Sequence, residues 1–415
     1  MRYGFWLPVF GGWLRNIDDE QMPATWDYVS DLTIKAEDLG YDLTLIAELN
    51  LNDIKGPAAD SLDAWSTAAA LAAITKRLEL MVAVRPTFHS PALLAKQAAN
   101  IDRISNGRLT LNVVSSWWAD EAKKYGIPFD QHDDRYARTS EWLDVLTQTW
   151  SHQHHTHTGR YYTIEDNLLS PKPHPTRTYS GYIPPTQPLS SRPKRSAVER
   201  PPYSYSSNEP PPLGAPSSPT APSSAKVGSH NANPAINPLL PTSSFLLPTF
   251  PTLYAGGESE TAKNLIAAKC DAYLMHGDNP STIATKIADM KQRRAQHPHL
   301  PELIFGVTGY CIVRDSEAEA NREVDRITQA PDPTKSPEGF ANFQQWISGS
   351  QLEKQISLRD YSVSNRGLQS GLIGTPEIVR QRLADFEAAG CSLVLLQSSP
   401  QHTEMARFAK QVMRR

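Results

Sequence analysis

One segment of the chain combines residue types that bind phosphate. In Tyr254-Ala-Gly-Gly-Glu-Ser-Glu260, two glycines and Ser259 lie between a strand-like run and a helix-like run. Glycines let the backbone approach a ligand closely, and the free N–H groups at a helix start favour an anion. The segment therefore predicts a phosphate-binding loop. The alternative is an ordinary turn in which Ser259 caps the helix.

A second segment, His132-Asp-Asp-Arg-Tyr136, comes just before a helix-like run. If the helix starts at His132, its imidazole and the Tyr136 phenol lie four residues apart on one face. These two groups can hydrogen-bond a cofactor edge or transfer a proton. The alternative is a surface histidine beside Asp133 as the helix cap.

Further polar side chains follow three strand-like runs, at the places where those runs end. They are Glu48, Asn50 and Asn52, then Arg85 and His89, and lastly Asn112, Ser115 and Ser116. The carboxyl ends of parallel barrel strands are where catalytic groups gather. We therefore expect these residues to belong to a functional site.

Two other signals carry no prediction of a cofactor. His152, His154, His155 and His157 form a tract that we place in a loop, without a carboxylate or cysteine at ligand spacing, so no metal site is expected. No Gly-x-Gly-x-x-Gly follows a strand, which argues against an NAD-binding Rossmann domain.

The elements that must position these residues alternate along the chain. Continuous apolar runs predict eight buried parallel strands near 2–9, 43–47, 78–84, 108–114, 252–256, 271–275, 303–309 and 392–397. Amphipathic helices separate them: one carries Val29, Leu32, Ala36 and Leu39 and ends at Gly40, and another starts at Thr375 and ends at Gly390. The pattern predicts a (β/α)₈ TIM barrel, with a doubly wound open sheet as the alternative.

Two segments interrupt this alternation. Residues 174–251 hold about half of the 34 prolines, and we predict a disordered insertion over 177–248. It separates the first four strands, in 1–176, from the last four, in 249–415. Alternatives are a proline-rich ligand for a partner domain and translated non-coding sequence. The long polar segment 329–374, before the eighth strand, predicts a lid or binding loop.

Bulk composition excludes several function classes. The formal net charge is -3, so no strong field attracts nucleic acid or a membrane surface. The three cysteines, Cys270, Cys311 and Cys391, lack a disulfide or metal spacing and favour a reducing cytoplasm. No apolar run approaches the roughly 20 residues that span a bilayer, and the apolar start of the chain fits a first strand better than a targeting signal.

Taken together, the motifs resemble the bacterial-luciferase-like flavin monooxygenases. The resemblance rests on Asp102-Arg-Ile-Ser-Asn-Gly-Arg108, on 111–116, on His132-x-x-x-Tyr136 and on 254–259. Within this family the chain looks most like dimethyl-sulfone monooxygenases, through the stretches 11–16, 48–56, 114–121 and 360–367. The similarity covers about 1–173 and 250–410.

The resemblance implies a two-component enzyme. A separate NAD(P)H-dependent flavin reductase would supply reduced FMN, which this chain would use with dioxygen to cleave dimethyl sulfone to methanesulfinate and formaldehyde. The resemblance implies that Ser115, His132 and Tyr136 contact the flavin. From their place at strand ends, we also expect Glu48 and Asn112 to bind the cofactor. It implies that Gly257, Glu258 and Ser259 hold the flavin phosphate, and that Arg366 closes on the phosphate or the substrate. We also expect a homo-oligomer.

Departures from the alkanesulfonate branch of the family bear on the substrate. Thr308 and Tyr310 stand where that branch has an arginine and a histidine, and Ser61 stands where it has a cysteine. A site without a fixed cation suits a neutral sulfone better than an anionic sulfonate. The predicted catalytic residues are His132, Tyr136, Tyr310 and Arg366, and the predicted substrate pocket is lined by Trp6, Phe10, Trp13, His89 and Thr308.

Three other functions stay open on the sequence. One is a monooxygenase of another small organosulfur compound, such as methanesulfonate. A second is a deazaflavin-dependent oxidoreductase, which shares the barrel and uses no oxygen. The third is a non-catalytic flavin-binding protein.

Overall fold

The computed structural model describes all residues except 16, 18, 178–249, 329–361 and 414–415. The described residues belong to one compact unit, made of 1–182 and 247–415. The predicted insertion over 177–248 therefore lies outside the described residues, apart from Arg177. Most of the predicted loop over 329–374 also lies outside them.

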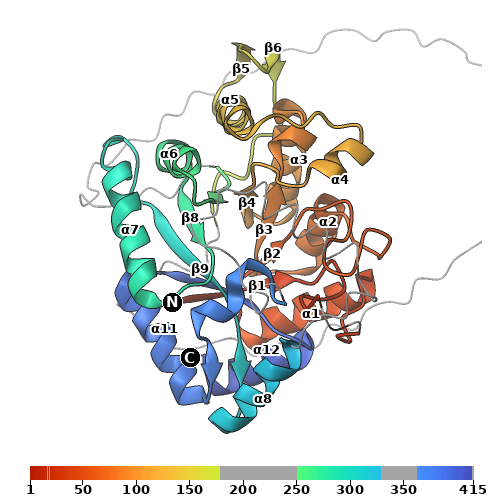
Figure 1. Cartoon of the computed structure of the whole chain (residues 1–415). Helices are drawn as coiled ribbons and strands as arrows, with labels where there is room; N and C mark the ends of the chain where they lie inside the picture. Colours follow the sequence, from red (N-terminus) through yellow and green to blue (C-terminus); the bar gives the residue numbers. More distant parts are fainter. Residues whose placement is uncertain (16, 18, 178–249, 329–361, 414–415) are drawn as a thin grey trace, which may run out of the picture. The chain divides into compact units, whose positions relative to one another are not determined.

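Eight parallel strands close into a barrel, as the alternation predicts (Figure 1). They are β1 (Arg2–Leu7), β2 (Leu43–Ile46), β3 (Glu79–Val84), β4 (Leu109–Val113), β7 (Leu253–Gly256), β8 (Ala272–Met275), β9 (Ile304–Tyr310) and β12 (Leu393–Gln397). The hydrogen-bonded order β1-β12-β9-β8-β7-β4-β3-β2 returns to β1. Closure confirms the TIM barrel and rules out the open sheet.

Helices surround the barrel. They are α1 (Trp26–Leu39), α2 (Ala64–Ile74), α3 (Pro91–Ile104), α4 (Ala119–Lys124), α5 (His132–Ser151), α6 (Glu260–Lys269), α7 (Pro280–Arg294), α8 (Glu317–Ile327), α11 (Pro376–Ala389) and α12 (Gln401–Gln411), with 3-10 turns η1 (Pro86–Phe88) and η2 (Ser364–Ser370). As predicted, a glycine terminates two of these helices. Gly40 follows α1 and Gly390 follows α11, and both glycines have the left-handed backbone conformation. Thr375 takes the N-cap position of α11, but its side chain makes no capping hydrogen bond to the backbone.

In the described part of the chain, four short strands lie outside the barrel. A hairpin forms from β5 (His154–Thr158) and β6 (Thr163–Leu168), and β10 (Ile312–Val313) pairs with β11 (Ile373–Gly374). The prediction that the histidine tract is a loop was therefore wrong. The segment His-His-Thr-His-Thr contains no apolar residue, so no hydrophobic alternation marked it as a strand.

The barrel interior is packed along most of its length. Side chains alternate along each strand between this interior and the layer beneath the helices. An apolar cluster fills the interior: Leu43, Leu45, Met81, Tyr254, Ala272, Leu274, Leu393 and Leu395. Below it, at the N-terminal end, Arg2 pairs with Glu79, and Thr110 Oγ1 donates to Glu79 Oε1 over 2.8 Å. Polar side chains for binding are left to the opposite, C-terminal ends of the strands.

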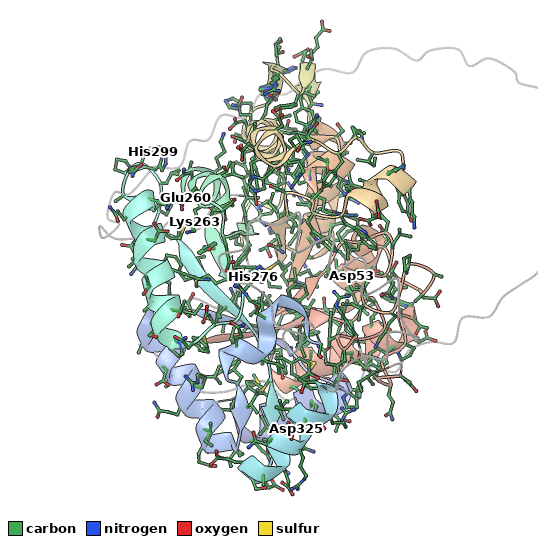
Figure 2. All side chains as sticks on the ribbon, in the orientation of Figure 1. Asp53, Glu260, Lys263, His276, His299 and Asp325 are labelled. Carbon is green, nitrogen blue, oxygen red and sulfur yellow. The ribbon has the colours of Figure 1, made fainter. Side chains whose placement is uncertain are left out.

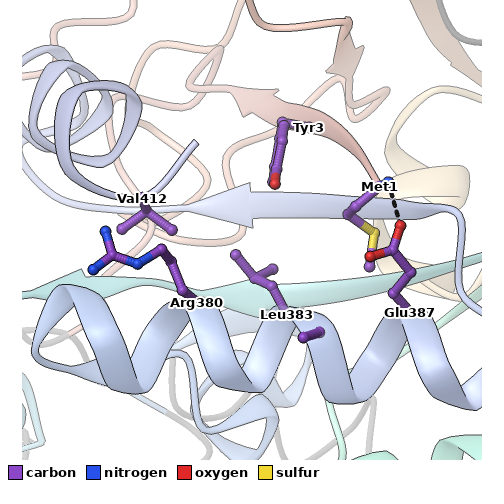
Figure 3. A pocket seen from close by; sticks show the side chains of 7 residues that line it. Met1, Tyr3, Arg380, Leu383, Glu387 and Val412 are labelled. Atoms are coloured by element: carbon purple, nitrogen blue, oxygen red, sulfur yellow. Dashed lines mark hydrogen bonds and ion pairs between the residues drawn. The ribbon is translucent and has the colours of Figure 1, made fainter. Parts of the chain in front are cut away.

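A cavity of about 220 Å³ lies at the N-terminal end of β1, against α11 (Figure 3). Its lining is Met1, Tyr3, Arg380, Leu383, Ala384, Glu387 and Val412. The amino terminus forms an ion pair of 2.8 Å with Glu387 Oε1 at its edge. None of the predicted site residues borders this cavity, so it is separate from the site described next.

Candidate active site

The predicted phosphate loop joins β7 to α6, as expected. Ser259 is the N-cap of α6, and its Oγ accepts a hydrogen bond from the backbone N–H of Ala262 over 3.2 Å. Ser259 also forms a side-chain hydrogen bond with Tyr136 of α5. A Cβ on Gly257 would lie 2.6 Å from Ala262 Cβ and 3.3 Å from Tyr136 Oη. Only glycine therefore fits between Tyr136 and the start of α6. The loop thus places a backbone without side chains next to the N–H groups of a helix N-terminus, which favours an anion.

Behind this loop, Glu258 is the centre of a buried charge cluster. Its carboxylate accepts a hydrogen bond of 2.8 Å from Lys286 Nζ of α7 and pairs with Arg366 Nη2 of η2. Burial would raise the pKa of Glu258, but the charges of His276 and Arg366 and the hydrogen bond from Lys286 lower it to about 2. The Glu258 side chain thus stays ionised and paired with these cations, so only the backbone of Glu258 is available to a ligand at the loop.

Two cations contact Glu258 in this cluster. Lys286 of α7 and Arg366 of η2 both pair with its carboxylate. Arg366 is buried, yet its Nε and Nη1 have no hydrogen-bond partner among the described residues. Figure 2 shows His276, just after β8, in the middle of the view, with Glu260 and Lys263 on α6. Buried guanidinium N–H groups without partners fit an anion beside the loop.

His132 and Tyr136 come together as the four-residue spacing predicts. Helix α5 starts at His132, and the two rings lie 5.0 Å apart between centroids. His132 Nδ1 lies 2.8 Å from Asp133 Oδ1, so Asp133 orients the imidazole instead of capping the helix, whose N-cap is Gln131. Burial raises the pKa of Tyr136, so its phenol stays protonated and can donate a hydrogen bond.

The end of β4 supplies two further predicted residues. Ser115 Oγ lies 3.0 Å from Thr139 Oγ1 of α5, which itself donates to the Arg135 carbonyl over 2.8 Å. The serine hydroxyl is therefore held on the α5 side of the mouth. Asn112 Oδ1 is buried and has no partner among the described residues.

The ends of β2 and β3 form an interlocked set of charges. Glu48 Oε1 lies 2.5 Å from His89 Nε2, and its Oε2 accepts the backbone N–H of Arg85 over 2.7 Å. The Arg85 guanidinium in turn pairs with Glu121 of α4. The carboxylate of Glu48 is buried, whereas the imidazole of His89 is 23% exposed. Glu48 therefore orients the imidazole of His89, which is partly exposed.

Asn52 is not part of this set. Its Nδ2 donates to the carbonyls of Phe10 and Asp60, and its Oδ1 accepts from the backbone of Ile54 and Lys55. All its hydrogen-bonding groups hold the loop that follows β2.

The predicted substrate-pocket residues do not all lie in one cluster. Trp6 and Trp13 are in contact, with ring centroids 6.2 Å apart in an edge-to-face arrangement. Phe10 instead packs in the large cluster between strands and helices, away from the interior cluster. Thr308 lies on β9 with a buried hydroxyl that has no partner among the described residues.

Tyr310 is buried at the end of β9, in an apolar cluster with Trp13, Leu14 and Val363. Its hydroxyl also lacks a partner among the described residues, and burial raises its pKa well above the usual value. The phenol is therefore neutral and remains a hydrogen-bond donor.

Sequence reasoning missed several members of the site. Lys286 comes from the middle of an ordinary amphipathic helix, and its contact with Glu258 needs the packing of α7 on the loop. Gln397 closes β12, and the strand-end rule used for Asn112 would have found it. Among the described residues, no group of three histidine, cysteine or carboxylate side chains is placed to hold a metal ion.

Comparison with known families places this geometry in context. The family described as luciferase-like monooxygenase matches residues 1–198 and 228–393, which is most of the chain. The chain belongs to the luciferase-like monooxygenase family. This membership confirms the resemblance inferred from the motifs and the prediction of a monooxygenase.

Individual relatives and solved structures are consistent with membership of this family. An "FMNH(2)-dependent dimethylsulfone monooxygenase" of Pseudomonas putida is 24% identical over 411 residues, covering 95% of this chain and 89% of that protein. The crystal structure of a long-chain alkane monooxygenase (LadA) has a TM-score of 0.70 at 15% identity, covering 99% of this chain and 90% of that one. DmoA from Hyphomicrobium sulfonivorans has a TM-score of 0.65 at 14% identity, covering 99% and 86%. These structures share the barrel fold.

Proposed function

We propose that the protein is a reduced-FMN-dependent monooxygenase that cleaves dimethyl sulfone to methanesulfinate and formaldehyde. The observation that carries the proposal is the division of the barrel mouth. The glycine-containing loop between β7 and α6, with Lys286 of α7 and Arg366 of η2 beside it, suits a phosphate, whereas β9 offers neutral donors. The Pseudomonas putida relative is named for the same cofactor and substrate.

The phosphate of FMN would be held by the backbone at Gly257 and Glu258 and by the hydroxyl of Ser259. Tyr136 donates from the opposite side of the loop, and Arg366 adds the N–H groups that lack partners in the described structure. A helix N-terminus and a guanidinium are both favourable for a phosphate dianion. Ser115, Asn112 and His132, along the α5 side of the mouth, would contact the flavin ring.

Bound reduced FMN supplies two electrons, which activate dioxygen so that one of its oxygen atoms enters the substrate. The side chains of the protein would hold and transfer protons. Because Glu48 holds His89 Nε2 at 2.5 Å, the ring orientation is fixed and Nδ1 is the atom left to exchange a proton. The buried charges of Arg85, Glu121 and Glu48 are paired with one another, so they keep this edge of the site rigid.

The neutral donors at the substrate end of the site suit an uncharged ligand. A buried sulfonate needs a permanent cation, whereas a sulfone needs only donors for its two oxygens. Thr308 and Tyr310 are neutral donors, and burial keeps the phenol of Tyr310 protonated. Arg366 pairs with Glu258 through Nη2, and its remaining N–H groups are assigned to the phosphate. These features support dimethyl sulfone over methanesulfonate.

The wider setting of the enzyme is proposed on the same basis. A separate NAD(P)H-dependent reductase would supply reduced FMN, and the chain would form a homo-oligomer. The described cysteines are all free and buried, which suits the reducing cytoplasm. Among the described residues, no helix has both the length and the apolar character needed to cross a membrane.

The decisive comparison uses two substrates at the same concentration of reduced FMN. Formaldehyde is measured after addition of oxygen in the presence of dimethyl sulfone or of methanesulfonate. We expect formaldehyde from the sulfone and little or none from the sulfonate. A clear preference for the sulfonate would refute the substrate assignment, and oxidation of substrate without oxygen would favour a deazaflavin-type oxidoreductase.

A further inference from the structure

Several buried polar atoms at the C-terminal end of the barrel have no hydrogen-bond partner among the described residues. On the adjacent strands β1 and β12 these include Trp6 Nε1 and Gln397 Nε2. Gln397 is 2% exposed. An unpaired buried donor destabilises the folded protein, and native proteins contain few of them. Two on adjacent strands therefore call for a ligand that pairs with them.

The strand register brings these two donors together. Strands β1 and β12 are parallel neighbours, and the register that pairs Phe5 with Leu396 places Trp6 beside Gln397. Both side chains belong to the interior-facing set. Gln397 comes two residues after Leu395, which fills the interior, and Trp6 packs against the same interior cluster. On the other side of β12, Leu395 is paired with Thr308, whose hydroxyl is also unpaired.

This group of donors lies away from the proposed cofactor phosphate. In the closed order of strands, β1 and β7 are four strands apart in either direction, which is opposite in a ring of eight. The loop of Gly257 and Ser259 follows β7, whereas Trp6 and Gln397 stand on β1 and β12. The unpaired donors are thus placed for a group other than the phosphate.

The chemistry of the donors defines that molecule. An indole N–H only donates, an amide NH₂ donates twice, and neither carries a charge. We propose that Gln397 and Trp6 donate hydrogen bonds to the oxygens of a neutral sulfonyl group and so form the oxygen-binding subsite for the substrate. This inference rests on the proposed function and assigns specificity to two residues that the family comparison does not.

Gln401 provides a matched control four residues along the chain. It is also buried, but both polar atoms of its amide have partners: Nε2 donates to the Trp6 carbonyl over 2.7 Å, and Oε1 accepts from Trp13 Nε1 over 2.8 Å. Replacing a satisfied buried amide leaves Trp13 Nε1 and the Trp6 carbonyl unpaired. Replacing an unsatisfied amide with an apolar side chain of similar volume removes a cost. The two glutamines should respond in opposite directions.

The test compares Gln397→Met with Gln401→Met in the full-length protein. We expect Gln397→Met to raise the KM for dimethyl sulfone at least 10-fold, with reduced-FMN binding unchanged and thermal stability equal or higher. Gln401→Met should lower thermal stability. Trp6→Phe, which removes the indole N–H, should also raise the KM for the sulfone.

Ligand binding is measured separately from turnover, as the thermal shift produced by dimethyl sulfone and by dimethyl sulfide, which lacks the oxygens. Gln397→Met should abolish the shift with the sulfone and leave any shift with the sulfide. Sulfone binding that depends on Gln397, without turnover, keeps this inference and refutes the proposed reaction. Turnover or binding that is unaffected by Gln397→Met, or a loss of stability equal to that of Gln401→Met, overturns the inference and leaves the proposed function standing. Absence of any sulfone binding to the wild-type protein also overturns it.

Discussion

The buried charge cluster behind the phosphate loop makes a quantitative prediction for Glu258→Gln. Glu258 is ionised between Lys286 and Arg366, and its pKa is lowered from 4.5 to about 2. At about 1.4 kcal/mol for each pKa unit, this difference corresponds to about 3 kcal/mol of folding stability at pH 7. The variant keeps the size of the side chain but removes the negative charge that lies between two buried cations. We therefore expect its free energy of unfolding at pH 7 to be lower by about 3 kcal/mol.

The pH dependence has a defined sign. Because the folded-state pKa is below the unfolded value, the stabilisation from Glu258 is fully present above pH 4.5 and is lost as the pH falls towards about 2. The difference between wild type and Glu258→Gln should shrink to about 1.5 kcal/mol at pH 3. Added phosphate should stabilise the variant at least as much as the wild type, because the cluster around Arg366 is then more positive.

Urea unfolding of the apoprotein measures these differences, since urea, unlike guanidinium, does not screen charges. Glu302→Gln is the matched control, because Glu302 is exposed and far from the cluster in the sequence. It should change stability by less than about 0.5 kcal/mol. Equal stability of Glu258→Gln and wild type at pH 7, or a difference that does not decrease at pH 3, would refute the account of the cluster.

Three further predictions address the cofactor loop, the substrate end and the insertion. Ser259→Ala should weaken binding of reduced FMN by about 1.5–3 kcal/mol in an anaerobic titration, because one charge-assisted hydrogen bond is lost; unchanged affinity would move the phosphate elsewhere. Tyr310→Phe should reduce turnover of dimethyl sulfone more than it reduces flavin binding, and equal losses in both would contradict a role at the substrate. Deletion of 178–248 should leave thermal stability and flavin binding intact or improved, provided that Arg177 is kept, because Arg177 Nη1 pairs with the buried Asp102 over 2.5 Å. Unfolding of the deletion variant would show that the insertion is structural.

The eight barrel strands were predictable because each is a continuous apolar run bounded by turn residues, as buried parallel strands must be. The conformation of the loop between β7 and α6 was predictable for a related reason. A strand, two glycines and a capping serine specify the local backbone without help from distant residues. Helix α5 likewise began at His132, so the pairing of His132 with Tyr136 followed from helical spacing alone.

What the sequence did not reveal depends on contacts between distant residues. The partners of Glu258 come from α7 and η2, and no local pattern links them to the loop. The pairing of Glu48 with His89 joins two strand ends that spacing could bring close but could not orient. The hairpin β5–β6 was missed because its strands are polar. Whether a buried polar group such as Gln397 lacks a partner is visible only once the surrounding side chains are placed.

The most direct test of the proposed function is a single turnover. The protein is loaded anaerobically with reduced FMN, mixed with dioxygen and dimethyl sulfone, and assayed for formaldehyde and hydrogen peroxide. The reaction consumes one dioxygen and one reduced FMN for each sulfone cleaved. We predict close to one formaldehyde for each bound FMN oxidised, with peroxide release suppressed by the sulfone. Failure to bind reduced FMN, or oxidation of the flavin that yields only peroxide whether or not the sulfone is present, would contradict the proposed activity.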